Sequence, residues 1–546
     1  MRKSLLQKER AKYQPKLPKA LRGAVKAQEG AATQSVGDQD AIQALFPITY
    51  GMPLVEFVPG EARQTQAMNV GVILSGGQAP GGHNVICGIF DEIKKLNPEN
   101  RLFGFLMGPG GLVDHEYKEL TADIIDEYRN TGGFDMIGSG RTKLENVDQF
   151  EKGIEIIREL GIKALVIIGG DDSNTNACVL AEYYAAKHYG VQVIGCPKTI
   201  DGDLKNDQIE TSFGFDTATK IYSDLIGNIE RDCNSARKYW HFIKLMGRSA
   251  SHIALECALQ AQPNICIISE EVEKKDMTLN QIVEQIATAV ADRASRGMNY
   301  GVVLIPEGLI EFIPSIGRLI DELNDLLATH GSEYKDLERN AQHAYILAHL
   351  SKENAETFET LPKDVARQLS LDRDPHGNVP VSLIATEELI SDMVSDKLDK
   401  WKKEGKYTGT FAAIHHFFGY EGRCAAPSNF DADYCYALGV SATQLIANGK
   451  TGYMAIVKNT TAPAEEWKAG GVPITMMMNM ERRNGVMKPV IRKALVDLDG
   501  KPFKKFVEKR DTWAKETCFV YPGPIQYWGP ANVSDRTTRT LALENE

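Results

Sequence analysis

Short apolar runs alternate with amphipathic, helix-like segments along most of the chain. Met68–Leu74 is a continuous apolar run that ends at Ser75–Gly76–Gly77, and an amphipathic stretch follows over 84–96. The alternation predicts further strands at 102–107, 134–137, 164–168, 191–195, 240–246, 264–269 and 300–306, and helices at 174–188, 216–233 and 279–295. Strands separated by helices of this length indicate parallel sheets flanked by helices. Ligands of such sheets bind at the carboxyl ends of the strands, where the glycine and carboxylate clusters of this chain fall.

The pattern also divides the chain. Between 311 and 407 the β signal fades and charged, helix-like segments predict a helical insertion, after which the alternation resumes at Thr410–Phe418. We therefore predict an α/β protein with two Rossmann-like domains whose sheets are mainly parallel. The predicted divisions are an N-terminal extension (1–65), a first domain (66–218 and 425–480), a second domain (219–310 and 408–424), the helical insertion (311–407) and a C-terminal segment (481–546).

Composition narrows the class of partner. The formal net charge of −11 argues against nucleic acid as the main partner, although a basic pocket for an anionic substrate can exist within it. No uninterrupted apolar run reaches the roughly 18 residues that span a bilayer, so we expect no membrane partner. The nine cysteines include no CxxC pair and are typical of reduced, buried thiols in a cytoplasmic protein. The basic, acid-poor N-terminus leaves a transit peptide as an alternative to a solvated or subunit-contacting arm.

Three loops that follow predicted strands carry candidate chemistry. In the loop 75–84, SGGQAPGGHN, glycines let backbone N–H groups approach an anion at a helix N-terminus, although a tight turn between strand and helix has the same pattern. In 168–174, IGGDDSN, two adjacent acids suit a magnesium ligand and an electrostatic gate, or simply cap a helix. The loop 197–204, PKTIDGDL, places a lysine, a hydroxyl and two carboxylates within six residues.

Together these loops supply what phosphoryl transfer requires. Lys198 and Arg141, the latter in the separate loop 138–142 after the predicted strand 134–137, are cations that can neutralise phosphate charge. The carboxylates offer a magnesium site and a base for the proton of the attacking group. Hydride transfer would need a nicotinamide-binding fingerprint, and the sequence has none. The combined pattern predicts a phosphotransferase.

At these residues the chain resembles the phosphofructokinase family. The motifs SGGQAPGG, GGDDS, PKTIDGD, MGRSA (246–250), PEG (306–308) and GYEGR (419–423) occur in the order of that family, over roughly 68–460 apart from the insertion. Within the family the chain is most similar to the long, pyrophosphate-dependent type. The resemblance implies a reversible, Mg²⁺-dependent transfer from pyrophosphate to the C1 hydroxyl of fructose 6-phosphate, giving fructose 1,6-bisphosphate and phosphate. It assigns the phosphoryl donor to the first domain and the sugar phosphate to the second.

The resemblance also implies roles for individual residues. Gly77, Arg141 and Lys198 would contact pyrophosphate, Asp201 would accept the proton from the sugar hydroxyl, and Asp171 and Asp203 would hold Mg²⁺. The residues implied in binding fructose 6-phosphate are Thr199, Ile200, Asp201, Met246, Gly247, Arg248, Glu307, Tyr420, Glu421, Gly422 and Arg423. Lys238 and Tyr239 match positions that reach the sugar site of a neighbouring subunit. A homodimer or higher homo-oligomer with shared active sites is therefore implied.

Two positions bear on the donor. ATP-using relatives carry glycine where this chain has Asp172 and Lys198. A carboxylate at Asp172 would lie where the α-phosphate of a nucleotide must pass, and at about 4 Å with an effective dielectric near 20 that repulsion is about 4 kcal/mol. Lys198 can instead hold the compact pyrophosphate and stabilise the transferred charge. The alternatives are an ATP-dependent phosphofructokinase, a catalytically silent regulatory subunit of the family, and an NAD or lipid kinase, which would not explain PKTIDGD, MGR and GYEGR together.

Overall fold

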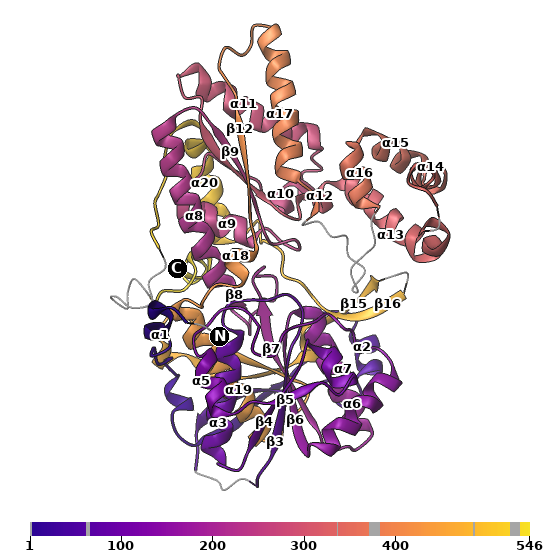
Figure 1. Ribbon diagram of the computed structural model, residues 1–546, viewed down its shortest axis with the longest axis vertical. Coiled ribbons are helices and arrows are strands. Elements are labelled where there is room, and N and C mark those ends of the chain that lie inside the picture. Colours follow the sequence, from indigo (N-terminus) through magenta and orange to yellow (C-terminus); the bar gives the residue numbers. More distant parts are fainter. Residues whose placement is uncertain (1–2, 62–65, 336, 371–382, 484–485, 525–534) are drawn as a thin grey trace.

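The computed structural model describes residues 3–61, 66–335, 337–370, 383–483, 486–524 and 535–546. The molecule is elongated, with a large sheet in its lower part and a small sheet in its upper part (Figure 1). Both sheets are flanked by helices and contain mainly parallel strand pairs, which confirms the predicted fold class.

The large sheet has the strand order β1-β2-β14-β13-β7-β6-β3-β4-β5, and β8 pairs with β7. Its central pairs, from β13 to β4, are parallel, and both edges are antiparallel. The strands are β1 (Val25–Ala32), β2 (Pro53–Pro59), β3 (Asn69–Leu74), β4 (Arg101–Phe105), β5 (Tyr117–Glu119), β6 (Ile162–Gly169), β7 (Gln192–Thr199), β8 (Phe213–Gly214), β13 (Tyr453–Lys458) and β14 (Lys468–Pro473).

Helices cover both faces of the large sheet because its central strands are apolar on both faces. Buried residues of α3 (Gly82–Leu96) and α19 (Asn429–Ala447) join one core, and those of α6 (Val147–Glu159) and α7 (Asp171–Ala186) join another. The loops that follow β3, β6 and β7 are thereby held at one end of the sheet, at the carboxyl ends of its parallel strands.

The small sheet is parallel throughout, with the order β10 (Ile265–Cys266), β11 (Gly301–Pro306), β9 (Trp240–Leu245) and β12 (Ala413–Phe418). Alternate residues of its strands face two different cores. One face packs against α8 (Phe215–Ala236) and α9 (His252–Ala261), and the other against α11 (Leu279–Ser295) and α17 (Thr386–Lys403).

The remaining elements surround these two layers. Among the described residues, 311–407 contains helices and no strand. Helices α13–α16 form a group beside the small sheet (Figure 1). The other elements are α1 (Leu5–Arg10), η1 (Lys19–Leu21), α2 (Gln39–Leu45), α4 (Pro109–Val113), α5 (Ala122–Tyr128), α10 (Ser269–Lys274), α12 (Leu309–Phe312), α13 (Pro314–Lys335), α14 (Arg339–His349), α15 (Lys352–Thr360), α16 (Lys363–Leu369), α18 (Tyr420–Arg423), η3 (Ala464–Glu466), η4 (Ile474–Met477), β15 (Met478–Arg483), β16 (Val486–Ile491), α20 (Lys501–Lys515) and α22 (Arg539–Glu544).

Three expectations from the sequence need correction. The predicted strand 134–137 is a turn in which the Phe134 carbonyl accepts a hydrogen bond from the Gly138 N–H at 2.7 Å; its apolar side chains are buried in the core, which explains the misleading pattern. No strand was predicted before residue 65, but β1 and β2 lie there and extend the large sheet. Most of the cysteines are buried as expected, but Cys424 is exposed.

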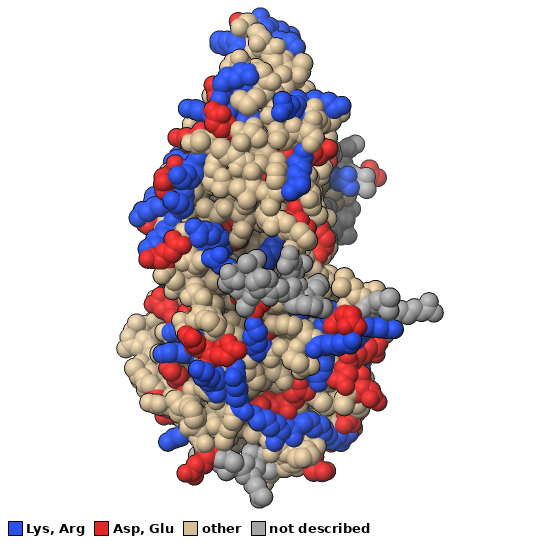
Figure 2. Space-filling model, turned by 90° about the vertical axis from the view of Figure 1, so that its left-hand side faces the viewer, with Lys and Arg blue, Asp and Glu red and all other residues tan. Residues whose placement is uncertain are grey.

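On the face in Figure 2, Lys and Arg side chains are interspersed with Asp and Glu, so the net charge of −11 does not make that face uniformly acidic. Within the described part of the chain, no helix has the length and apolar character required to cross a membrane.

Candidate active site

The loops at the carboxyl ends of the two sheets meet at one pocket of about 250 Å³. The large sheet contributes the loops after β3, β6 and β7, and the small sheet contributes those after β9, β11 and β12. The residues that line the pocket are Gly76, Gly77, Gln78, Arg141, Gly170, Asp171, Asp172, Ser173, Lys198, Thr199, Ile200, Asp201, Asp203, Met246, Arg248, Ser249, Glu307, Tyr420, Arg423 and Lys493.

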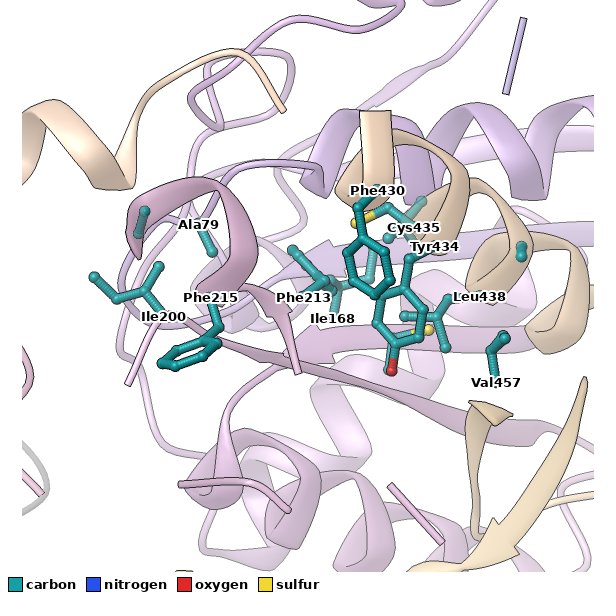
Figure 3. Packing of buried hydrophobic residues seen from close by; sticks show 14 of the residues in the cluster. Ala79, Ile168, Ile200, Phe213, Phe215, Phe430, Tyr434, Cys435, Leu438 and Val457 are labelled. Atoms are coloured by element: carbon teal, nitrogen blue, oxygen red, sulfur yellow. The ribbon is translucent and has the colours of Figure 1, made fainter. Parts of the chain in front are cut away.

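Buried apolar side chains anchor the polar loops. Figure 3 shows Ala79 of the glycine loop and Ile200 of the loop after β7 close to Phe213 and Phe215, within a cluster that continues to Phe430 of α19. Each functional loop thus carries apolar residues into the core. This packing holds the loops in place, while the polar residues beside the apolar anchors still face the pocket.

The glycine loop leaves room for cations. A Cβ atom at Gly76 would lie 3.3 Å from the Nζ of Lys198, and one at Gly77 would lie 1.9 Å from the Nη2 of Arg423. Gly76 also has a φ of +82°, which glycine adopts without strain. The loop is held in place by the hydrogen bond from the Gly76 N–H to the Gly140 carbonyl at 2.9 Å. Glycine at these positions therefore brings two positive charges against the backbone of a loop suited to phosphate.

Asp171 and Asp172 form the first turn of α7, where the helix dipole favours negative charge. Burial alone would raise the pKa of Asp171. Lys493, a hydrogen bond from the Asp172 backbone, Arg483 and Arg248 together outweigh burial, and the pKa is lowered. The Asp171 Oδ2 atom is buried and accepts no hydrogen bond from the described residues. The Lys493 Nζ lies 3.6 Å from this oxygen, and an ionised carboxylate oxygen also suits a hard cation.

The loop after β7 presents Lys198, Asp201 and Asp203 to the pocket. The Asp201 N–H donates to the Thr199 Oγ1 at 3.0 Å, which fixes the turn that carries its carboxylate. Burial lowers the pKa of Lys198 to about 8, and burial together with the neighbouring Asp201 raises that of Asp203 to about 7. The loop therefore combines a cation whose charge is sensitive to pH with two carboxylates in different environments.

The small sheet supplies the opposite wall. The Glu307 Oε2 accepts a hydrogen bond from the Gly247 N–H at 2.9 Å, and burial raises the pKa of Glu307. A Cβ at Gly308 would lie 1.9 Å from the Arg248 carbonyl oxygen, so the loops after β9 and β11 pack closely. Arg423 lies 5.4 Å from the centre of the Tyr420 ring, and its Nε donates to the Gln78 carbonyl at 3.3 Å. This last contact joins the two walls.

Some residues predicted for the site do not line this pocket. Lys238 and Tyr239 precede β9, at the opposite end of the strand from Met246, and the Lys238 Nζ lies 5.1 Å from the centre of the Tyr239 ring. Glu421 is exposed, and Gly422 is buried against the ring of Tyr222. The other predicted residues line the pocket, apart from Gly247, whose N–H binds the carboxylate of Glu307.

Sequence reasoning did not single out several lining residues. Gly76, Gln78, Gly170 and Ser173 belong to the predicted loops and could have been found from the loops themselves. The Ser173 Oγ donates to the Ser75 Oγ at 2.8 Å and joins two of those loops. Lys493 is different, because it comes from the segment after β16, and no local pattern there indicates a site.

The candidate metal ligands in the pocket are carboxylates. Among the residues that the structure describes, no three His, Cys, Asp or Glu side chains come together as a ligand set for a metal ion. Mg²⁺, however, is usually held by one or two carboxylates together with water and substrate phosphates. Asp171 and Asp203, which both line the pocket, are compatible with such a site.

An α/β fold whose strand ends collect a glycine loop, several cations and ionisable carboxylates in one pocket is that of a phosphoryl-transfer enzyme. The family model for phosphofructokinase matches residues 69–446. The chain belongs to the phosphofructokinase family.

Individual relatives agree with this assignment. The chain is 67% identical to the pyrophosphate–fructose 6-phosphate 1-phosphotransferase of Porphyromonas gingivalis, over 100% of this chain and 99% of the relative. It is 55% identical to the enzyme of the same name from Entamoeba histolytica, over 99% of both chains. A crystal structure of a pyrophosphate-dependent phosphofructokinase from Marinobacter aquaeolei matches with a TM-score of 0.53 at 17% identity, over 88% of this chain and 97% of that one, and shows a shared fold.

Proposed function

We propose that this enzyme transfers a phosphoryl group from pyrophosphate to the C1 hydroxyl of fructose 6-phosphate, giving fructose 1,6-bisphosphate and phosphate. The observation that carries the proposal is that Asp172 and Lys198 line the same pocket as Asp201, Arg248 and Glu307. The names of the relatives, which specify pyrophosphate and fructose 6-phosphate, support it.

The donor is pyrophosphate because of the charges that surround the glycine loop. Lys198 and Arg141 neutralise the phosphates, while the carboxylate of Asp172 repels the α-phosphate that a nucleotide would place nearby. ATP as donor, the main alternative, would need that space free of negative charge. A silent subunit would not need Asp171, Asp201, Asp203 and Arg248, which all line the pocket here.

The chemical step needs a proton acceptor at the sugar hydroxyl. Asp201 takes the C1 hydroxyl proton as the C1 oxygen bonds to the terminal phosphorus and the P–O–P bridge bond breaks. The bridging oxygen leaves with the released phosphate, whose charge Lys198 and Arg141 stabilise. Arg248 and Arg423 hold the 6-phosphate, and Glu307 fixes the Met246–Arg248 loop through the Gly247 N–H.

Asp171, with Asp203, would hold Mg²⁺, which supplies charge neutralisation and orientation for the phosphates when it is bound. Lys238 and Tyr239 lie outside the pocket of their own chain and would complete the site of a second copy. A homodimer is thus the smallest assembly with complete sites. We place the enzyme in the cytoplasm.

The reaction is tested in both directions with purified protein and Mg²⁺. Fructose 6-phosphate should be converted only when pyrophosphate is added, and fructose 1,6-bisphosphate with phosphate should regenerate pyrophosphate. Activity with ATP alone would keep the sugar site but overturn the donor assignment. Activity with neither donor would favour the silent-subunit alternative.

A further inference from the structure

A strap of the C-terminal segment, residues 492–496, crosses the pocket between the two sheets. It follows β16, leads toward α20 and lies outside the part of the chain that matches the family model. On the large-sheet side, the Ala494 N–H donates to the Asp203 carbonyl at 2.7 Å. On the small-sheet side, the Ala494 carbonyl contacts the His252 Nε2 at 2.8 Å, and the Val496 N–H donates to the Glu270 Oε1 at 3.0 Å. The strap is therefore fixed from both sides.

Fixing the strap places the side chain of Lys493 inside the pocket. Its Nζ donates to the Ser249 Oγ at 2.9 Å and lies 3.6 Å from the Asp171 Oδ2. Only 23% of the side chain is exposed. Burying an ammonium group is costly unless it has charged or polar partners, so these two contacts explain why the side chain remains in the pocket.

The two partners of Lys493 belong to opposite walls. Asp171 follows β6 beside the glycine loop, which is the donor side of the proposed reaction, and Ser249 follows Arg248 on the sugar side. A phosphoryl group that moves from donor to acceptor must cross the junction between these walls. It carries negative charge on three oxygens, and an ammonium group offers three hydrogen-bond donors.

We propose that Lys493 is a phosphate-binding residue of this active site and contacts the phosphoryl group while it is transferred. The proposal rests on the proposed function, because only in that reaction does a phosphoryl group cross the junction between the two walls. Without substrate, the ammonium group pairs with Asp171 and Ser249. With substrate bound, phosphate oxygens become its partners. The strap thereby makes the C-terminal segment part of the active site.

The test compares Lys493→Met with Lys493→Arg and with Lys504→Met, a control on the exposed surface of α20. Loss of one preorganised donor to the transferred group should lower kcat/KM for pyrophosphate about 10²–10³-fold in Lys493→Met. The KM for fructose 6-phosphate should change little, because the 6-phosphate is held elsewhere. Lys493→Arg should recover most of the activity, and Lys504→Met should behave as the wild type.

A second readout does not depend on turnover. Calorimetry with imidodiphosphate, a pyrophosphate analogue, should show at least about tenfold weaker binding to Lys493→Met than to the wild type. A folded Lys493→Met protein with unchanged kcat/KM and unchanged imidodiphosphate affinity would overturn the proposal. If Lys493→Met fails to fold, the same comparison is made between Lys493→Gln, which is neutral, and Lys493→Arg, which keeps the charge. Equal kcat/KM for pyrophosphate in these two variants would reject a role for the charge. A wild type without pyrophosphate-dependent activity would instead contradict the proposed function, while the binding comparison would still test Lys493.

Discussion

Two roles are proposed for single residues of the pocket: some bind the charged phosphate groups, and one accepts a proton. We propose the second role for Asp201, whose backbone N–H donates to the Thr199 Oγ1 and whose side chain lines the pocket between the walls. Asp172 and Lys198, which line the same pocket, are proposed to act on charge at the donor end. The tests at this scale therefore separate proton transfer from donor binding.

Asp201→Ser should keep sugar binding but lower turnover by about 10³–10⁴-fold, because serine cannot accept the hydroxyl proton at neutral pH. Steady-state kinetics gives kcat, and calorimetry with fructose 6-phosphate gives the affinity. A near-normal kcat would remove Asp201 as the base. Loss of sugar affinity alone would make it a binding residue.

The lowered pKa of Lys198, about 8, gives a pH dependence. Lys198 is charged below that pH and loses its charge above it, so kcat/KM for pyrophosphate should fall as the pH rises through about 8. Lys198→Arg keeps its charge and should shift the alkaline limb upward. Since pyrophosphate ionises identically in both assays, identical pH profiles would show that another group controls this limb.

At the scale of elements, the insertion is tied to the sheet beneath the sugar loops. Lys244 of β9 is buried, forms an ion pair with Glu387 of α17 at 3.2 Å, and donates to the Ile384 carbonyl at 2.8 Å. Lys244 lies two residues before Met246, so this contact supports the strand from which the sugar loop begins. Removing one partner leaves an uncompensated buried charge.

Glu387→Gln should lower the free energy of unfolding by about 3–5 kcal/mol, measured as a fall in the midpoint of urea unfolding. Replacing both partners, with Lys244→Met and Glu387→Leu, should recover much of that loss because no charge stays buried. The exposed pair of Lys397 and Glu284 provides the control, and Glu284→Gln should cost at most about 1 kcal/mol. Equal effects of the two single variants would show that burial of the pair is unimportant.

The elements also show what the sequence could predict. The strands that alternate with helices were predictable because apolar runs and glycine loops are local signals; the predicted helix 279–295 coincides with α11. Lys493 was not predictable, because a lone lysine becomes a site residue only when a distant strap folds over the pocket. The pairing of β1 and β2 with the large sheet is likewise a long-range contact. The strand prediction for 134–137 was wrong because these apolar residues are buried in a turn and do not pair in a sheet.

At the scale of the whole molecule, the pocket forms where the two sheets face each other, and a second copy is proposed to complete it. Lys238 and Tyr239 lie at the end of β9 away from their own pocket. In a symmetric dimer, the same pair from each copy would reach the other. This arrangement makes each site depend on two chains.

Mixing two impaired variants tests the shared site. Asp201→Ser disables the site of its own chain, and Lys238→Ala with Tyr239→Ala disables the site of the partner. After subunit exchange a mixed dimer has one intact site, so activity should return to about a quarter of the wild-type value if exchange is random. Each variant mixed with itself is the control. No recovery despite mixed dimers being detected would mean that the sites are not shared.

The central claim, pyrophosphate as donor, is tested most directly by the ratio of kcat/KM with pyrophosphate to that with ATP, measured in the wild type and in Asp172→Gly with Lys198→Gly. The wild type should use pyrophosphate and show little or no turnover with ATP. The double variant should lose pyrophosphate activity and gain some use of ATP, because a repulsive carboxylate and a pyrophosphate-binding cation are removed together. An unchanged ratio in the double variant, or a wild type that prefers ATP, would contradict the account.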